Sequence, residues 1–79
     1  MNHSPAPTVA TRAPKYRADI KGQVAIYIAE FEASVRAEIN NPESDTFIFC
    51  AEDAHAYAEY SDYLTEHEMQ AAFKRAERV

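Results

Sequence analysis

Apolar side chains recur at helical spacing through the first half of the chain. They fall three or four positions apart, as on one face of an amphipathic helix: Ile20, Val24, Tyr27, Ile28, Phe31, Val35 and Ile39. Asp19 is a suitable N-cap for such a helix, although Gly22 weakens its first turn. The pattern therefore predicts a long first helix that starts near Asp19 and ends near Ile39.

A second stripe of this helix consists of alanines at strict four-residue spacing, roughly opposite the larger apolar residues. Its members are Ala25, Ala29, Ala33 and Ala37. Small side chains let another backbone approach closely, so this side could be covered by a second element. Alanine is also the best helix former, and we favour this second explanation.

The segment "NNPES" at 40–44 predicts a turn, because Asn41 can cap a helix whose first residue is Pro42. A second helix could begin there or after Asp45. "TFIFC" at 46–50 suits a short strand as well as a helix, but the chain has no convincing second strand to pair with it. A helix over 46–64 is therefore favoured.

As a helix, residues 46–64 would have three different sides. The core face would hold Phe47, Cys50, Ala51, Ala54, Tyr57, Ala58, Ser61 and Leu64. An aromatic flank would hold Phe49, Ala56, Tyr60 and Tyr63, and an acidic stripe would hold Glu52, His55, Glu59 and Asp62. The acids would thus point away from the core.

Residues 65–68, "TEHE", have the form of a capping box, in which Thr65 caps a third helix and Glu68 reaches back. The apolar side of this helix would hold Met69, Ala72, Phe73, Ala76 and Val79. One unbroken helix over 46–78 is the alternative, since the apolar faces nearly align across the junction. We favour the break at Thr65.

The first 15 residues contain three prolines and mostly small or polar side chains, too little apolar surface to offset the entropy of ordering. The predicted fold class is therefore all-α: a disordered tail over 1–15, then a small three-helix domain over 16–79. The domain would be a helical hairpin plus a shorter C-terminal helix. A core drawn from so few residues is marginal, so a partner surface or a homodimer is expected.

Charge narrows the classes of partner. The formal net charge is −5, and no Lys or Arg occurs between Ala37 and Phe73. Direct binding of nucleic acid, which needs clustered cations, is therefore not expected. A protein with a positively charged surface is the expected partner, because complementary charge speeds encounter.

The expected compartment is the cytoplasm. The single cysteine, Cys50, excludes an internal disulfide and suits a reducing environment. No apolar stretch resembles a signal peptide or approaches the length of a membrane span, so no membrane association is expected.

The sequence gives little indication of a catalytic or metal-binding site. Glu52 and His55 have the Glu-x-x-His spacing that ferritin-like di-metal bundles use, and Glu32 would lie at a similar height in a hairpin. Both residues of the pair would face away from the core, however, so an exposed stripe is favoured over a metal site. Cys50 would lie on the core face, and one glycine cannot build a phosphate loop. No cofactor, metal or enzymatic activity is expected.

The favoured hypothesis is a protein-binding surface on the second helix, made of Phe49, Glu52, Asp53, Glu59, Tyr60, Asp62 and Tyr63. Aromatic side chains among carboxylates suit a basic groove that normally holds nucleic acid. The concrete form of this hypothesis is a phage-type inhibitor of a nucleic-acid enzyme, such as an anti-CRISPR protein, because small acidic chains of this kind are common among the products of viruses and mobile elements. Nucleic-acid mimicry is its candidate mechanism. For Phe49 and Tyr60, completion of a small core is the alternative, and a self-associating helical module is the rival function.

Overall fold

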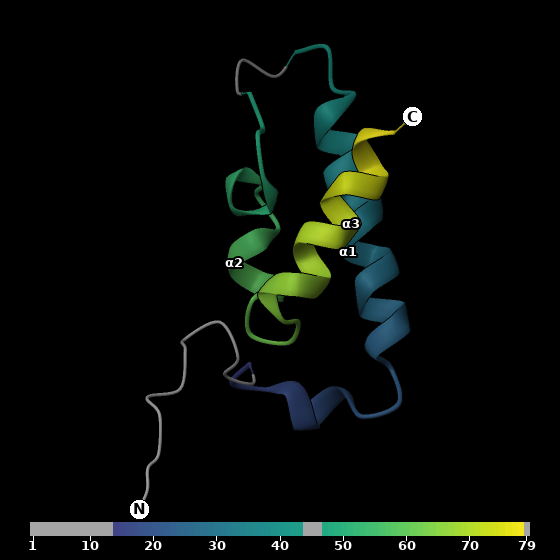
Figure 1. The fold of residues 1–79 in the computed structure, drawn as a ribbon, viewed down its shortest axis with the longest axis vertical. Coiled ribbons are helices and arrows are strands. Elements are labelled where there is room, and N and C mark those ends of the chain that lie inside the picture. The colour runs from purple at the N-terminus through teal and green to yellow at the C-terminus, as the bar shows by residue number, and fades with distance from the viewer. Residues whose placement is uncertain (1–13, 44–46, 79) are drawn as a thin grey trace, which may run out of the picture.

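The computed structural model describes residues 14–43 and 47–78, and within them it confirms the predicted all-helical, three-helix domain (Figure 1). The three helices are α1 (Val24–Ile39), a single turn α2 (Tyr57–Tyr60) and α3 (Glu66–Glu77). Two 3-10 turns, η2 (Arg17–Ile20) and η3 (Ala51–Asp53), complete the elements. Most of the predicted disordered tail, residues 1–13, lies outside the described residues.

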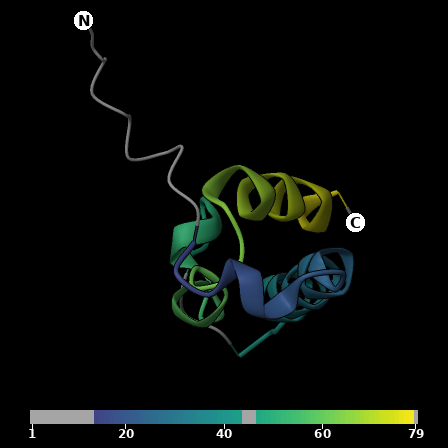
Figure 2. The same cartoon turned by 90° about the horizontal axis from the view of Figure 1, so that it is seen from below.

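The two long helices, α1 and α3, lie side by side and run in the same direction (Figure 1). Seen from below, the η3–α2 segment lies to one side of this pair (Figure 2). The core between the helices consists of the predicted apolar faces, with Phe31, Val35, Met69, Ala72, Phe73 and Ala76 buried. Both faces are therefore confirmed as core-facing within the described residues, which do not include Val79.

The start of the first helix differs from the prediction. α1 begins at Val24, its N-cap is Gln23, and Asp19 provides no cap. Gly22 has a φ of +85°, in the left-handed region that glycine reaches without steric cost, so the chain turns there instead of continuing as a helix. Ile20 still reaches the core, but it does so from the separate turn η2 and is only 2% exposed.

The predicted second helix over 46–64 is wrong. Residues 47–49 have no regular structure, and Cys50 is extended. Between Cys50 and Thr65, only η3 and the single turn α2 are helical. The expected start at Pro42 is also wrong, because residues 42–43 form a turn in which the Glu43 N–H donates to Asn41 Oδ1. The alternative start after Asp45 adjoins residues 44–46, which are outside the described part of the chain.

Side-chain acceptors explain why this segment is not a helix. The Phe49 N–H donates to Asp53 Oδ2 at 2.8 Å, and the Ala51 N–H donates to Gln70 Oε1 at 3.2 Å. The His55 N–H donates to Glu38 Oε1 at 2.9 Å. In a helix, each of these amides would donate to the backbone carbonyl one turn earlier. Here Glu38 of α1 and Gln70 of α3 accept two of the hydrogen bonds, and Asp53 accepts the third.

The faces predicted for residues 46–64 are correspondingly mixed. Ala51, Ala54 and Leu64 are buried as expected. Phe47, placed on the core face by helical spacing, is 79% exposed, and Ala58 is exposed as well. In an extended stretch alternate side chains point to opposite sides, which leaves Ile48 against the core and its two neighbours outside. Cys50, Tyr57 and Ser61 are half-buried.

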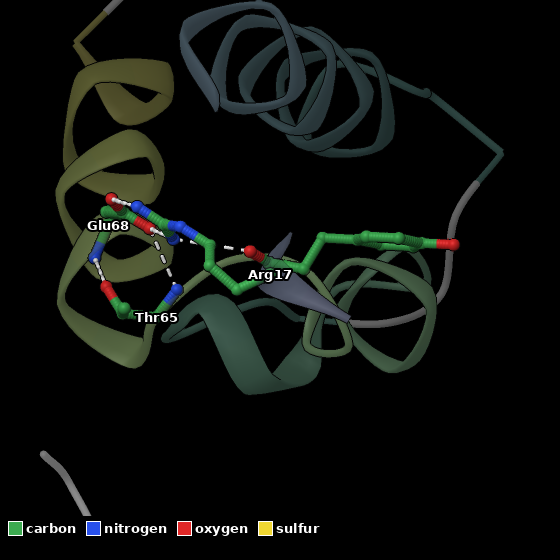
Figure 3. Close-up of polar contacts among 4 residues, drawn as sticks. Arg17, Thr65 and Glu68 are labelled. Atoms are coloured by element: carbon green, nitrogen blue, oxygen red, sulfur yellow. Dashed lines mark hydrogen bonds and ion pairs between the residues drawn. The ribbon is translucent and has the colours of Figure 1, made fainter. Parts of the chain in front are cut away.

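The break at Thr65 and its capping box are confirmed. Thr65 Oγ1 accepts from the Glu68 N–H at 3.1 Å, and Glu68 Oε1 accepts from the Thr65 N–H at 2.8 Å. Arg17 adds a bidentate pair to the same carboxylate, at 2.6 and 2.8 Å (Figure 3). These bonds, led by the one from Arg17, lower the pKa of Glu68 to about 2. The cap of α3 thereby also anchors η2.

Candidate functional site

The outer side of the η3–α2 segment carries carboxylates and no Lys or Arg. Glu52, Asp53 and Glu59 are exposed, and Glu52 and Asp53 belong to η3 while Glu59 belongs to α2. Asp53 accepts the Phe49 N–H, which holds one carboxylate oxygen against the backbone of the extended stretch. All three belong to the binding surface predicted from the sequence, and their exposure makes them accessible to a partner.

The arginines that make ion pairs lie elsewhere in the fold. Glu32 on α1 accepts from Arg75 at 2.7 Å and from Arg36 at 3.0 Å. The hydrogen bond from Arg75, followed by that from Arg36, lowers the pKa of Glu32 below its usual value. Arg17 pairs with Glu68. In residues 14–43 and 47–78, the carboxylates of the η3–α2 segment thus have no cationic partner within ion-pair distance.

Tyr60 and Tyr63 are half-buried, with their rings packed against the core. The Tyr60 ring lies 5.7 Å from Phe31 and 6.1 Å from Tyr27, and the Tyr63 ring lies 5.2 Å from Tyr27. Tyr60 is half-buried and donates its hydroxyl to Glu30 Oε1 at 3.1 Å. Burial, then this bond, raises the pKa of Tyr60 to about 12. Tyr60 therefore fits the alternative in which it completes the core.

Asp62, the remaining acid of the predicted surface, is half-buried. Its backbone carbonyl accepts the Tyr16 N–H at 2.7 Å, which ties the loop after α2 to the start of η2. Tyr16 and Tyr63 also pack together, with ring centroids 6.0 Å apart. Asp62 and Tyr63 thus belong to a structural contact, and they offer less free surface than Glu52 and Glu59.

Phe47 and Phe49 are the most exposed large apolar side chains among the described residues. Each is 79% exposed, and their rings stack with centroids 6.1 Å apart at an interplanar angle of 27°. Phe49 was predicted to belong to the binding surface, whereas Phe47 was predicted to face the core. The alternation Phe-Ile-Phe was the available signal, because period two places the first and third residues on one side.

An open pocket of about 260 Å³ adjoins this aromatic pair. Its lining comes from three segments: Ile39 at the end of α1, Phe47 and Ile48 in the extended stretch, and Glu77 at the end of α3. Ile39 and Ile48 are apolar, and Glu77 is the charged residue of this lining. Neither Ile39 nor Glu77 was a candidate site residue in the sequence, because only the fold brings the two helix ends beside the extended stretch.

The Glu52 and His55 pair is not assembled with Glu32. His55 Nδ1 lies 3.5 Å from Glu38 Oε2, whereas Glu32 is held by Arg36 and Arg75. Within the described residues, no group of three or more His, Cys, Asp or Glu side chains is placed to hold a metal ion. The same residues include no helix long and apolar enough to cross a membrane.

Comparisons with protein-family models, with curated proteins and with solved structures give no match to this chain.

Proposed function

We propose that this chain is a small acidic protein-binding module that inhibits or regulates a macromolecule with a basic surface. The observation that carries the proposal is the separation of charge: the arginine pairs involve Glu32 and Glu68, whereas Glu52, Asp53 and Glu59 are exposed and unneutralised within the described residues. An uncompensated acidic surface attracts a basic one and raises the rate of encounter.

The exposed aromatic pair adds contact area to this charge. Phe47 and Phe49 lie in the stretch that leads into the acidic turn, and Asp53 bonds to the backbone of Phe49. Large exposed aromatic side chains are frequent among residues that dominate binding energy at interfaces. The site proposed from the structure therefore consists of Phe47, Phe49, Glu52, Asp53 and Glu59, with Tyr60, Asp62 and Tyr63 as its structural support.

The specific form of the proposal is an inhibitor of a nucleic-acid enzyme. Such an enzyme has a basic groove for phosphates, and spaced carboxylates on a small rigid body could occupy it. Phage-type inhibitors, anti-CRISPR proteins among them, are the class that this chemistry would suit. Nucleic-acid mimicry is the corresponding mechanism, in which Glu52 and Glu59 take positions that phosphates would otherwise fill.

The test is affinity capture from a lysate of the cells in which the protein acts, at low and at raised salt. Wild-type protein should retain a stoichiometric nucleic-acid-handling partner that is lost as salt rises, because exposed charges are screened. The double variant Glu52→Lys, Glu59→Lys should keep the far-ultraviolet circular dichroism of the wild type and lose that partner. The neutral pair Glu52→Gln, Glu59→Gln should show an intermediate loss. Unchanged capture by the charge-reversed variant would refute the proposed surface.

A self-associating module is the second candidate, and one observation favours it. Ala25, Ala29, Ala33 and Ala37 are all exposed on α1, and the neighbouring Ile26 is 55% exposed. Sedimentation velocity separates the two candidates. A dimer that persists at high salt and dissociates in Ile26→Glu would support self-association, whereas a monomer under all conditions would exclude it.

A further inference from the structure

The fold brings an arginine of α1 to the cations at the end of α3. Lys74 and Arg75 lie in the last turn of α3, and Arg78 is its C-cap. Arg36 lies in the last turn of α1, and its Nη2 donates to the Arg75 carbonyl at 3.2 Å. These four side chains, from two helices, form what we call the basic end of the molecule.

Positive charge exceeds negative charge at the basic end. Arg36 and Arg75 share one carboxylate, that of Glu32, so one of their two charges is left uncompensated. The other two cations are exposed and make no ion pair in the described residues, and the exposed Glu77 offsets one of them. The C-terminal dipoles of α1 and α3 lower the excess by about half a charge each, which does not reverse its sign.

The hydrogen bonds of Arg75 leave donors free for a further anion. Arg75 donates to Glu32 through Nε at 2.7 Å, and its two Nη nitrogens have no acceptor within residues 14–43 and 47–78. The side chain is 46% exposed. A guanidinium held by one nitrogen presents its remaining N–H groups in a fixed plane, which matches the geometry of a carboxylate. The basic end is therefore preorganised to bind a carboxylate of another molecule.

The basic end lies on the opposite side of the molecule from the acidic surface on the η3–α2 segment. Glu66 of α3 accepts the Tyr57 hydroxyl and so faces α2. Arg75 follows about two and a half turns later, which places it on the other side of the helix. Seen from below, the η3–α2 segment and the C-terminal end of α3 likewise lie on opposite sides (Figure 2). One molecule therefore cannot join its own two surfaces, whereas two molecules can.

We propose that the basic end of one molecule binds the acidic surface of a second copy, so that the chain associates head to tail. The proposal rests on the acidic surface of the function proposed above and adds its regulation, because a surface covered by a second copy is closed to the partner. The second copy is the occupant because this chain carries both complementary surfaces. Phe47 and Phe49 adjoin the acids and add faces on which a guanidinium stacks.

The net charge of −5 opposes this association at a distance but not at contact. At an ionic strength of about 0.1 M the screening length is about 10 Å, so charges on the far sides of two molecules scarcely interact. Each exposed ion pair contributes at most about 1 kcal/mol, so the contact is weak and depends on protein concentration. A head-to-tail contact also leaves one free surface of each kind, so association continues beyond the dimer.

The test is sedimentation velocity over a series of protein concentrations. At about 0.1 M NaCl the sedimentation coefficient of the wild type should rise with concentration, and at about 1 M the association should weaken about 10-fold or more, because the screening length falls to about 3 Å. Two charge-reversed variants, Glu52→Lys with Glu59→Lys and Lys74→Glu with Arg78→Glu, should each sediment as monomers. All four positions are exposed, and far-ultraviolet circular dichroism checks that the fold is kept.

An equimolar mixture of the two monomeric variants gives the sharpest result. The first variant keeps the basic end and the second keeps the acidic surface, so the mixture should form a one-to-one complex and nothing larger. If Lys74→Glu with Arg78→Glu does not fold, Lys74→Gln with Arg78→Gln takes its place. The control Lys21→Glu changes an exposed charge next to η2, outside both surfaces, and should associate within about 2-fold of the wild type.

A mixture that stays monomeric would overturn the proposal, as would a wild type that is monomeric at every concentration. Association that persists at high salt or in both variants would also overturn it and would indicate the exposed face of α1 instead. The proposed function is decided separately, because the variant Lys74→Glu with Arg78→Glu keeps the acidic surface. That variant should capture the partner at least as well as the wild type does, whether or not the chain associates with itself.

Discussion

The α1–α3 pair and the segment 47–63 reach the same core by different means. In the pair, regular helices bring buried residues such as Phe31 and Phe73 into contact, and backbone bonds stay within each helix. In the segment, only two short turns are regular, and acceptors from Glu38 and Gln70 hold amides of the irregular parts. Local spacing determines the first region, whereas contacts with distant residues determine the second.

The largest expected effect comes from truncating the core of the pair. Phe31→Ala removes a fully buried ring and leaves a cavity between α1 and α3, at a cost of about 3–5 kcal/mol in the free energy of unfolding. A domain of this size has a total stability of roughly 0.05–0.15 kcal/mol per residue. Because the loss is a large fraction of that total, the urea midpoint of the variant, followed by far-ultraviolet circular dichroism, should lie far below that of the wild type.

Phe49→Ala is the matched control, because it removes the same ring from a site that is 79% exposed. Its free energy of unfolding should lie within about 0.5 kcal/mol of the wild-type value. Similar losses in the two variants would mean that the Phe49 ring is buried in solution, and the distinction between the two regions would fail.

An intermediate effect is expected at the junction of the regions, where Arg17 binds Glu68. Glu68 has a folded pKa of about 2, whereas a carboxyl in the unfolded chain titrates near 4.3. As pH falls, the unfolded chain takes up this proton first. The stability that the contact contributes is thus complete above about pH 5 and is lost progressively down to about pH 2.

Glu68→Gln should lower the free energy of unfolding at neutral pH by about 1–2 kcal/mol, since the pair is partly exposed and screened. Glutamine keeps an acceptor for the capping box, so the change reports mainly on charge. Urea denaturation at a series of pH values should show the variant and the wild type converging near pH 2. The control Glu59→Gln changes an exposed carboxylate without an ion pair in the described residues, so its free energy of unfolding should follow that of the wild type at every pH. If Glu68→Gln were less stable than the wild type by the same amount at every pH, the assigned pKa of Glu68 would be contradicted.

The same contrast explains what the sequence could predict of the fold. Helical spacing identified the core faces of α1 and α3, and the Thr65 capping box located the start of α3, because these signals are local. Gly22 was recognised as a weak point but not as a complete break, since its left-handed conformation depends on where the preceding turn packs. The irregular path of 47–56 could not be predicted, because Glu38 and Gln70 become acceptors only once the helices are paired.

In the candidate site, too, some features follow from the local sequence and others depend on contacts with distant residues. Exposure of Glu52 and Glu59 was predicted from their place on the acidic side of a helix over 46–64, and both are exposed although that helix does not form. Tyr60 could not be assigned to core or surface from spacing alone, since its partners Tyr27 and Phe31 belong to α1. Glu77 lies far from Phe47 in sequence, so the pocket has no sequence signature. The residues of the surface were thus partly predictable, and the cavity was not.

The smallest expected effect tests whether the hydrogen bonds to Glu38 and Gln70 stabilise the segment 47–63 independently of the α1–α3 pair. Gln70→Ala removes the acceptor of the Ala51 N–H. Because Ala51 is 0% exposed, water cannot easily replace that acceptor. Amide hydrogen exchange in residues 51–60 should accelerate about 5-fold, equivalent to about 1 kcal/mol, while amides in the core of α1 and α3 keep wild-type rates. Lys74→Ala, an exposed substitution on the same helix, should leave both sets unchanged. If Gln70→Ala accelerated exchange equally in all three helices, the segment would unfold only together with the pair, and its stability would not depend on its own acceptors.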